Sequence, residues 1–278
     1  MKQYLLLSAT VLTVIVVCLS ACKKKDSNDS PNPGVINLNL GNDTTLMEGD
    51  TLLLDAGHPG STFLWSDGTT GSTLQVDTTG TYWVRVTKGN DIGSDTIHVY
   101  LAYKLAKIET DFGNMLIWLY PQTPLHRANF IKLVSEQFYD SLIFHRVVDN
   151  FVIQGGDPTG TGYGGPGYTI PAEFRSAITH INGAVGAARQ ADNVNPEKAS
   201  NGSQFYIVDN VNGTHSLDGN YTVFGLVIDG ISTVDAISQV PVNPGNNRPI
   251  DNVYMKKVTI VNYTAAQLIT NFGFTIPH

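Results

Sequence analysis

The sequence is poor in charged residues and in cysteine. Only 15% of its 278 residues are Asp, Glu, Lys or Arg, against roughly 25% in ordinary globular chains. Long exposed helices and coiled coils depend on such side chains, so the composition favours β structure. The 24 acidic residues outnumber the 17 basic ones, and the net charge is −7. No segment is basic enough to neutralise many phosphates, and we expect no nucleic-acid partner.

Both cysteines, Cys18 and Cys22, lie close to the N-terminus. If that segment is removed from the mature protein, the folded part has no disulfide and no thiol nucleophile. The seven histidines are never spaced as metal ligands are in short motifs. We therefore expect neither a metal ion nor another cofactor.

Residues 1–21 are typical of a signal peptide. Lys2 supplies the positive end, an apolar run extends from Leu5 to Val17, and Ala21 is the small residue before a cleavage site. The run is shorter than the ~20 residues that a spanning helix needs. The sequence LSAC at 19–22 is similar to a bacterial lipoprotein box, in which Cys22 becomes the lipidated first residue. Plain secretion after Ala21 is the alternative.

Residues 22–34, CKKKDSNDSPNPG, are polar and contain two prolines, and we interpret the stretch after the cysteine as a flexible tether. Two or more acyl chains on Cys22 provide stable anchoring to a lipid bilayer. The protein is then expected in the cell envelope, attached to the outer membrane or to the periplasmic face of a bacterial membrane.

Residues 35–102 have the pattern of a small β-sandwich, because short apolar runs alternate with clusters of turn residues. The expected strand runs are VINLNL, TLLLDAG, TFLWS, TLQVD, TYWVRVT and DTIHVYL. Alternation predicts a shared core containing Tyr82, Val84 and Val86 from one strand, with Phe63 and Trp65 from another.

Trp65 and the Gly80-Thr81-Tyr82 sequence give this segment a resemblance to immunoglobulin-like modules, related to polycystic-kidney-disease repeats, of bacterial surface proteins. The resemblance implies a spacer that holds the next domain away from the membrane. Binding of a carbohydrate or a protein is the alternative, and the sequence does not distinguish the two.

Residues 104–264 follow a different pattern. The segment 108–120 predicts two strands about a turn, and 123–138 and 232–238 have helical spacing. Three blocks stand out: FHRVVDNFVIQGGD at 144–157, NGSQFYI at 201–207 and LDGNYTVFG at 217–225. In this order, and over about 160 residues, they resemble the cyclophilin-type peptidyl-prolyl isomerases.

This resemblance implies a mainly β protein, in which the small N-terminal sandwich precedes an eight-stranded antiparallel β-barrel capped by two helices, with 265–278 as a C-terminal tail. It implies cis-trans isomerisation of X-Pro bonds in exported or envelope polypeptides, in aid of their folding. Rotation breaks no bond, so the reaction needs an apolar pocket for the proline ring and donors for the twisted amide.

The same resemblance makes Arg146 the catalytic residue, as a permanently charged, forked donor to the prolyl carbonyl and the amide nitrogen. The substrate-binding residues that it implies are Phe151, Val152, Gln154, Ala188, Arg189, Gln204, Tyr206, Leu217 and Tyr221. The two glutamines interrupt apolar strands, where an unpaired amide is costly, which favours contact with the peptide. We interpret His145 as structural and the glycine-rich segment 160–167 as a surface loop.

Several positions depart from the best-known family pattern. Tyr206 stands where Phe is common, and Tyr221 takes the place of a His. Ser216 replaces the Trp of drug-sensitive members, so we expect weak cyclosporin binding. The loop 190–200 is longer than in short members. We expect a monomer that binds proline-containing clients. The alternative function is a surface binding module that captures such segments with incidental turnover.

Overall fold

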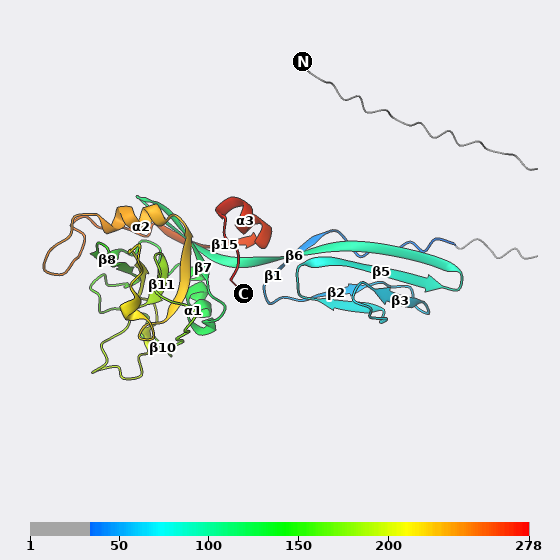
Figure 1. Cartoon of the computed structure of the whole chain (residues 1–278), viewed down its shortest axis with the longest axis horizontal. Helices are drawn as coiled ribbons and strands as arrows, with labels where there is room; N and C mark the ends of the chain where they lie inside the picture. Colours follow the sequence, from blue (N-terminus) through cyan, green and yellow to red (C-terminus); the bar gives the residue numbers. More distant parts are fainter. Residues whose placement is uncertain (1–33, 278) are drawn as a thin grey trace, which may run out of the picture.

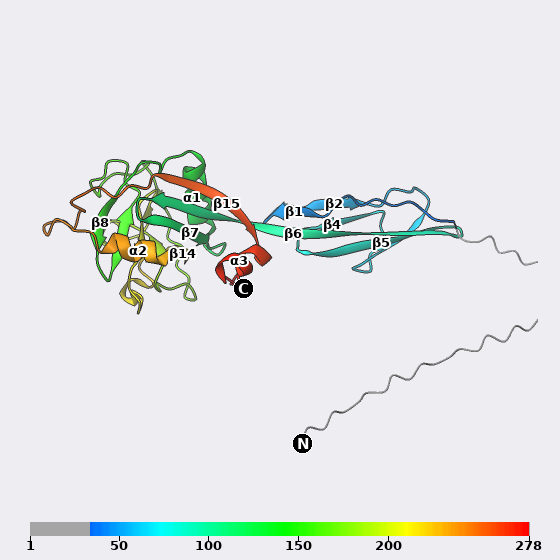
Figure 2. The ribbon, with the colours of Figure 1, turned by 90° about the horizontal axis from the view of Figure 1, so that it is seen from above.

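The computed structural model describes residues 34–277, so the signal peptide, Cys22 and nearly all of the tether lie outside the described residues. Two parts lie end to end along the long axis of the molecule, and one long strand, β6 (Asp91–Thr110), extends through both (Figures 1 and 2). No helix in the described residues has the length and apolar character needed to cross a membrane.

The N-terminal part is built from two sheets that enclose a common core. Its strands are β1 (Thr44–Met47), β2 (Leu52–Asp55), β3 (Thr62–Trp65), β4 (Thr73–Val76), β5 (Gly80–Lys88) and the first half of β6. β2 pairs with β4, while β3, β5 and β6 form an antiparallel sheet to which β1 adds in parallel. The five predicted core residues are confirmed: Trp65, Val84 and Val86 are buried, and Phe63 and Tyr82 pack against them.

One predicted strand of this part is wrong. The run VINLNL makes only an isolated bridge, between Val35 and Ile92. A side chain replaces the strand partner here, because the backbone N–H of Leu40 donates to the Asp95 carboxylate at 2.7 Å. The edge strand is instead β1, which pairs with the segment Val99–Ala102 of β6.

The change of pattern expected between residues 102 and 104 falls inside β6. The first half of this strand pairs with β5, and the second half pairs with β7 (Gly113–Leu119) and β15 (Lys257–Thr264). The backbone N–H of Glu48 also donates to the carbonyl of Ala102 at 2.9 Å, and its carboxylate forms an ion pair with Arg127. The two parts are thus joined by a strand and a salt bridge.

The C-terminal part is a curved antiparallel sheet of eight strands in the order β15-β6-β7-β14-β11-β13-β9-β8. Its other strands are β8 (Phe144–Val148), β9 (Val152–Gly155), β11 (Ala184–Ala187), β13 (Phe205–Val208) and β14 (Val223–Asp229), and β10 (Thr169–Ile170) pairs with β12 (Ser200–Asn201) outside this sheet. No continuous ladder closes the barrel. Three backbone hydrogen bonds link its ends, from Ser141 to Met255, from Phe144 to Val253 and from Met255 to Leu142.

Two helices cover the barrel as predicted, α1 (Pro124–Ser135) and α2 (Ile231–Ser238). The side chain of Thr123, which precedes α1, makes no capping hydrogen bond to the helix. The buried Glu173 carboxylate takes this role, because it accepts the backbone N–H groups of Leu125 and His126 and is bonded to the His126 imidazole at 2.7 Å. A distant loop therefore fixes the start of the helix.

The described part of the C-terminal tail, residues 265–277, is ordered. It forms α3 (Ala265–Phe272), which begins at a capping box made by Thr264 and Gln267. Leu268 is fully buried, and the ring of Phe274 lies 5.4 Å from that of Trp118. The tail thus covers the barrel beside its junction with the N-terminal part (Figure 1).

Candidate active site

Nine of the ten predicted site residues meet in one cavity of about 270 Å³. Strands β8, β9 and β13 and the segments that follow β11 and precede β14 bring them together. Its lining consists of Arg146, Phe151, Val152, Gln154, Ala188, Arg189, Tyr206, Leu217 and Tyr221. We call it the proline cavity. All of its lining residues were predicted.

Arg146 lies in β8, half-buried, with Gln154 of β9 as its cross-strand partner. Its guanidinium is 5.8 Å from the centroid of the Phe151 ring, and no side chain among residues 34–277 forms an ion pair or hydrogen bond with it. Burial lowers the pKa of Arg146, yet a guanidinium stays charged at any pH at which proteins fold. Its donors are therefore available to a ligand.

The rest of the proline cavity offers apolar contacts. Val152 and Tyr206 are buried, while Phe151 and Leu217 are half-buried at the cavity surface. The Tyr206 and Tyr221 rings meet edge to face, with 6.0 Å between their centroids. A compact apolar ring such as that of proline can be buried here beside a charged donor.

The hydroxyl of Tyr206 has a partner that the sequence analysis missed. It donates to Nε2 of the buried His180 at 2.8 Å, and Nδ1 of His180 donates to the Asp218 carboxylate at 2.7 Å. Burial lowers the pKa of His180, although the Asp218 carboxylate opposes this effect. The neutral imidazole therefore joins β13 to the segment that carries Leu217. The extra hydroxyl of Tyr206 was the signal that could have prompted a search for such a partner.

Arg189 supports Tyr221, the residue that replaces a histidine. Its guanidinium lies 4.5 Å from the centroid of the Tyr221 ring. It also donates to the carbonyl of Asn220 at 2.7 Å and to the Asp192 carboxylate at 2.6 Å. Arg189 thus fixes one rim of the proline cavity by stacking and by an ion pair.

The tenth predicted residue, Gln204, lies beside the proline cavity and does not line it. Its amide nitrogen donates to the carbonyls of Gly162 and Gly164 at 3.1 and 2.7 Å, and its oxygen accepts from Gln154 at 3.1 Å. Gln204 thus supports a loop and Gln154, and it lines the neighbouring larger cavity. Its contact with the peptide stays a prediction. The sequence pattern could not reveal these partners, since the two carbonyls belong to the backbone.

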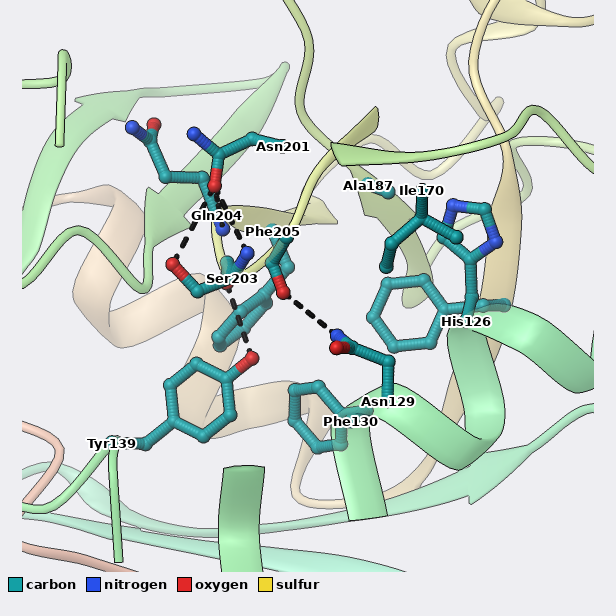
Figure 3. A pocket seen from close by; sticks show the side chains of 12 residues that line it. His126, Asn129, Phe130, Tyr139, Ile170, Ala187, Asn201, Ser203, Gln204 and Phe205 are labelled. Carbon is teal, nitrogen blue, oxygen red and sulfur yellow. Dashed lines mark hydrogen bonds between the residues drawn. The ribbon is translucent and has the colours of Figure 1, made fainter. Parts of the chain in front are cut away.

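Side-chain hydrogen bonds hold the segment Asn201–Gln204 in place beside a hollow of about 10 Å³ (Figure 3). The Asn201 side chain accepts the backbone N–H groups of Ser203 and Gln204. Asn129 donates to the carbonyl of Gly202 and Tyr139 to that of Ser203, at 2.7 and 3.2 Å. The hollow has room for about one water molecule, so it supports the NGSQ segment and cannot hold a peptide side chain.

The long loop 190–200 borders a second cavity of about 620 Å³, which shares Gln154, Ala188 and Arg189 with the proline cavity. Asn195 stabilises the loop by exchanging two hydrogen bonds with the backbone of Ala199. The loop therefore extends the groove on the side of Ala188. Within residues 34–277 no group of three His, Cys, Asp or Glu side chains is placed to hold a metal ion.

The buried Asp157 carboxylate organises the glycine-rich loop, which is a loop as predicted. It accepts the backbone N–H groups of Thr159, Thr161, Gly162 and Gly164, at 2.7, 3.0, 2.6 and 3.2 Å. Burial raises the pKa of this carboxyl, but the hydrogen bonds outweigh burial and lower the pKa to about 2. Asp157 thereby sets the rim of the cleft beside Arg146.

Replacing Asp157 by Asn is expected to lower the free energy of unfolding at pH 7 by about 1–3 kcal/mol, because several N–H groups lose a charged acceptor. In the wild type this contribution is complete above pH 3.8, the unfolded value, and is lost as the pH falls through the folded pKa of about 2. Urea unfolding from pH 7 to pH 2 measures both effects. The exposed Asp251→Asn is the control, and equal stability of the two variants would contradict the prediction.

Apolar side chains for a small ring lie beside an arginine that has no hydrogen-bond or ion-pair partner among residues 34–277, which suits the binding of a proline-containing peptide. Comparison with known proteins agrees. Residues 105–260 match the family described as cyclophilin type peptidyl-prolyl cis-trans isomerase/CLD. This match spans more than half of the chain, which therefore belongs to that family and is a peptidyl-prolyl cis-trans isomerase.

Individual relatives cover the C-terminal part. The chain is 38% identical to human peptidyl-prolyl cis-trans isomerase-like 3 over 158 residues, which are 55% of this chain and 93% of the relative. It is 38% identical to a probable peptidyl-prolyl cis-trans isomerase A of Mycobacterium bovis over 178 residues, or 58% and 93% of the two chains. A Cryptosporidium parvum cyclophilin, solved in the presence of the dipeptide Ala-Pro, matches with a TM-score of 0.52 and 31% identity, over 56% of this chain and 98% of its own.

Proposed function

We propose that this isomerase acts on proline-containing segments of exported or envelope polypeptides while lipid on Cys22 holds it to a bacterial membrane. The observation that carries the proposal is the leader, whose apolar run ends in LSAC and is followed by a polar tether. Residues 23–34 can reach at most ~40 Å when extended. The enzyme is then confined to a thin layer at the membrane surface, on its outer-membrane or periplasmic side, where exported chains fold.

The N-terminal part is proposed to be an immunoglobulin-like spacer. The described chain enters it at the end remote from the isomerase part, where Val35 bridges Ile92 (Figure 1). The segment of β6 from Ile92 to Ala102 extends about 33 Å at ~3.3 Å per residue. Because β6 continues into the barrel without a linker, the spacer sets both the distance and the orientation of the proline cavity relative to the tether.

In the reaction, the proline ring occupies the proline cavity and Arg146 binds the prolyl carbonyl. Amide resonance gives a barrier of about 18–20 kcal/mol. As the bond twists, the nitrogen becomes pyramidal and its lone pair localises, so a guanidinium N–H can donate to it. The dry wall formed by Phe151, Leu217 and Tyr206 strengthens this hydrogen bond because it excludes water. No base is needed, so His145 takes no part in the chemical step.

Cyclosporin binding is proposed to be weak. Ser216 lies exposed in the short helix His215–Leu217 at the edge of the proline cavity, and it stands where drug-sensitive relatives carry Trp. The three Trp of this chain, at 65, 83 and 118, lie elsewhere. The monomeric state also stays a prediction.

Replacing Cys22 by Ser is expected to release the protein from the membrane in soluble form. The serine variant offers no thiol for the acyl chains, and the remaining polar tether has no affinity for the bilayer core. Detergent phase partitioning and the intact mass of the purified protein measure the result. Cys18→Ser is the matched control and should leave both unchanged. Unaltered membrane attachment of the Cys22 variant would refute the lipid anchor.

A further inference from the structure

A third cavity, of about 410 Å³, adjoins the proline cavity and shares Arg146 and Gln154 with it. We call it the arginine cavity. Its lining residues are His145, Arg146, Gln154, Gly160, Thr161, Gly162, Tyr163, Asn246 and Arg248. It lies away from Ala188 and Arg189, which border only the other two cavities. A peptide whose prolyl carbonyl is bound to Arg146 therefore reaches it with the residues that follow the proline.

The arginine cavity has uncompensated positive charge. Neither Arg146 nor Arg248 forms an ion pair with a carboxylate in the described part of the chain. Arg248 donates only to neutral oxygens, the carbonyl of Gly160 at 3.0 Å and the amide of Asn252 at 3.3 Å. The nearby Asp157 carboxylate is occupied by hydrogen bonds from its own loop. Two cations thus meet at one cleft of a protein whose net charge is −7.

His145 provides a second, independent observation. His145 is only 6% exposed, and neither ring nitrogen has a hydrogen-bond partner among residues 34–277. A buried imidazole without partners is costly and rare in folded proteins. Its Cδ2–Nε2 edge borders the cavity at Gly162, since a Cβ placed on Gly162 would lie 3.7 Å from both atoms. A ligand in the cavity can therefore give this imidazole the acceptor that the protein does not supply.

We propose that the arginine cavity binds a carboxylate of the client, carried by the side chain of a residue just after the proline or by the end of the client chain. Two guanidinium groups and one imidazole donor suit a carboxylate, since charge-assisted hydrogen bonds are the strongest that such a group forms. The proposal rests on the assignment of the prolyl carbonyl to Arg146. It predicts that this isomerase prefers acidic residues after proline.

Amidated peptides of sequence Ala-Ala-Pro-Xaa-Ala test this preference, with Glu, Gln or Lys at Xaa and with NMR exchange as the measure of kcat/KM. We expect the Glu peptide to exceed the Gln peptide about tenfold, as follows from one charge-assisted hydrogen bond, and the Lys peptide to be slowest. A Gln peptide with a free C-terminal carboxylate distinguishes the two sources of the anion. Equal values for the Glu, Gln and free-carboxylate peptides would overturn the proposal.

Variants test whether the preference for Glu arises in the arginine cavity. Arg248→Gln is expected to bring the Glu/Gln ratio of kcat/KM close to one, whereas Arg248→Lys keeps most of it. The control is Arg175→Gln, because Arg175, like Arg248, donates only to neutral oxygens but borders none of the three cavities. An equal effect of the Arg175 variant, or none of Arg248→Gln, would refute the assignment.

Peptide dissociation constants, measured for the same set, separate this proposal from the role of Arg146. A Glu preference that persists in Kd while catalysis fails supports the arginine cavity and counts against the catalytic assignment. If the Kd values show no preference for the Glu peptide, the arginine cavity does not bind the carboxylate.

Discussion

Replacing Arg146 by Ala is expected to lower kcat/KM for an Ala-Pro peptide by about 10- to 150-fold. This range follows from one charge-assisted hydrogen bond of roughly 1.5–3 kcal/mol that is made in the transition state. Peptide affinity should change less, because the ring still contacts Phe151 and Leu217. A protease-coupled assay gives the rate, and calorimetry gives the affinity of the folded variant.

Two further variants show whether the effect belongs to the guanidinium of Arg146. Arg175→Ala removes an arginine that makes only surface contacts, and it should leave the rate unchanged. Arg146→Lys keeps the charge without the fork and should recover only part of the activity. If Arg146→Ala loses affinity as much as rate, the site behaves as a binding module and the catalytic assignment fails.

Replacing Gly186 by Ala is expected to destabilise the protein by about 1–3 kcal/mol and to lower kcat/KM at least tenfold. Gly186 of β11 lies opposite Tyr206 of β13, and a Cβ there would overlap the tyrosine ring. The ring must then move, and with it the wall of the proline cavity and the hydrogen bond to His180. Thermal unfolding and the isomerase assay measure the two effects.

Gly245→Ala serves as the matched control for this prediction. A Cβ on Gly245 meets only the Asn243 side chain, at an ordinary 3.4 Å, in a loop outside the proline cavity. Both stability and activity should stay close to wild type. If a folded Gly186→Ala variant retains full activity below its unfolding temperature, the position of the Tyr206 ring does not limit the reaction.

The membership of the proline cavity was predictable because it follows from local motifs. Arg146, Phe151 and Gln154 occupy one continuous block, and a β-hairpin brings its two halves together by register alone. Tyr206 and Leu217 lie in two further blocks of fixed order. Residue type and spacing are sequence properties, so such blocks can be compared without a structure.

The supporting contacts were not predictable, since their partners are far apart in sequence or belong to the backbone. His180 lies 26 residues from Tyr206, and Arg248 reaches the site across 88 residues to Gly160. The two carbonyls that bind Gln204 could come from any residue type. No periodicity or motif marks such pairs, because the fold of the intervening chain decides them.

The continuity of one strand through both parts was not predictable, for a different reason. A change of pattern was sought near residue 103, but no glycine or proline lies between Gly93 and Gly113, and apolar alternation continues through Lys104. Such a segment can form one long strand. Whether it does so depends on partners at both ends, β5 on one side and β7 and β15 on the other.

The sequence by itself determined the class of protein, the reaction and the residues around the proline ring, because motifs encode which chemical groups are present and in what order. Only the tertiary structure decided that Gln204 supports a loop, that His180 binds Tyr206, and that two arginines line one cavity with no carboxylate paired to either among residues 34–277. These features arise from distances between segments remote along the chain. Hydrogen bonds and charges depend on such distances, and the linear order of residues does not contain them.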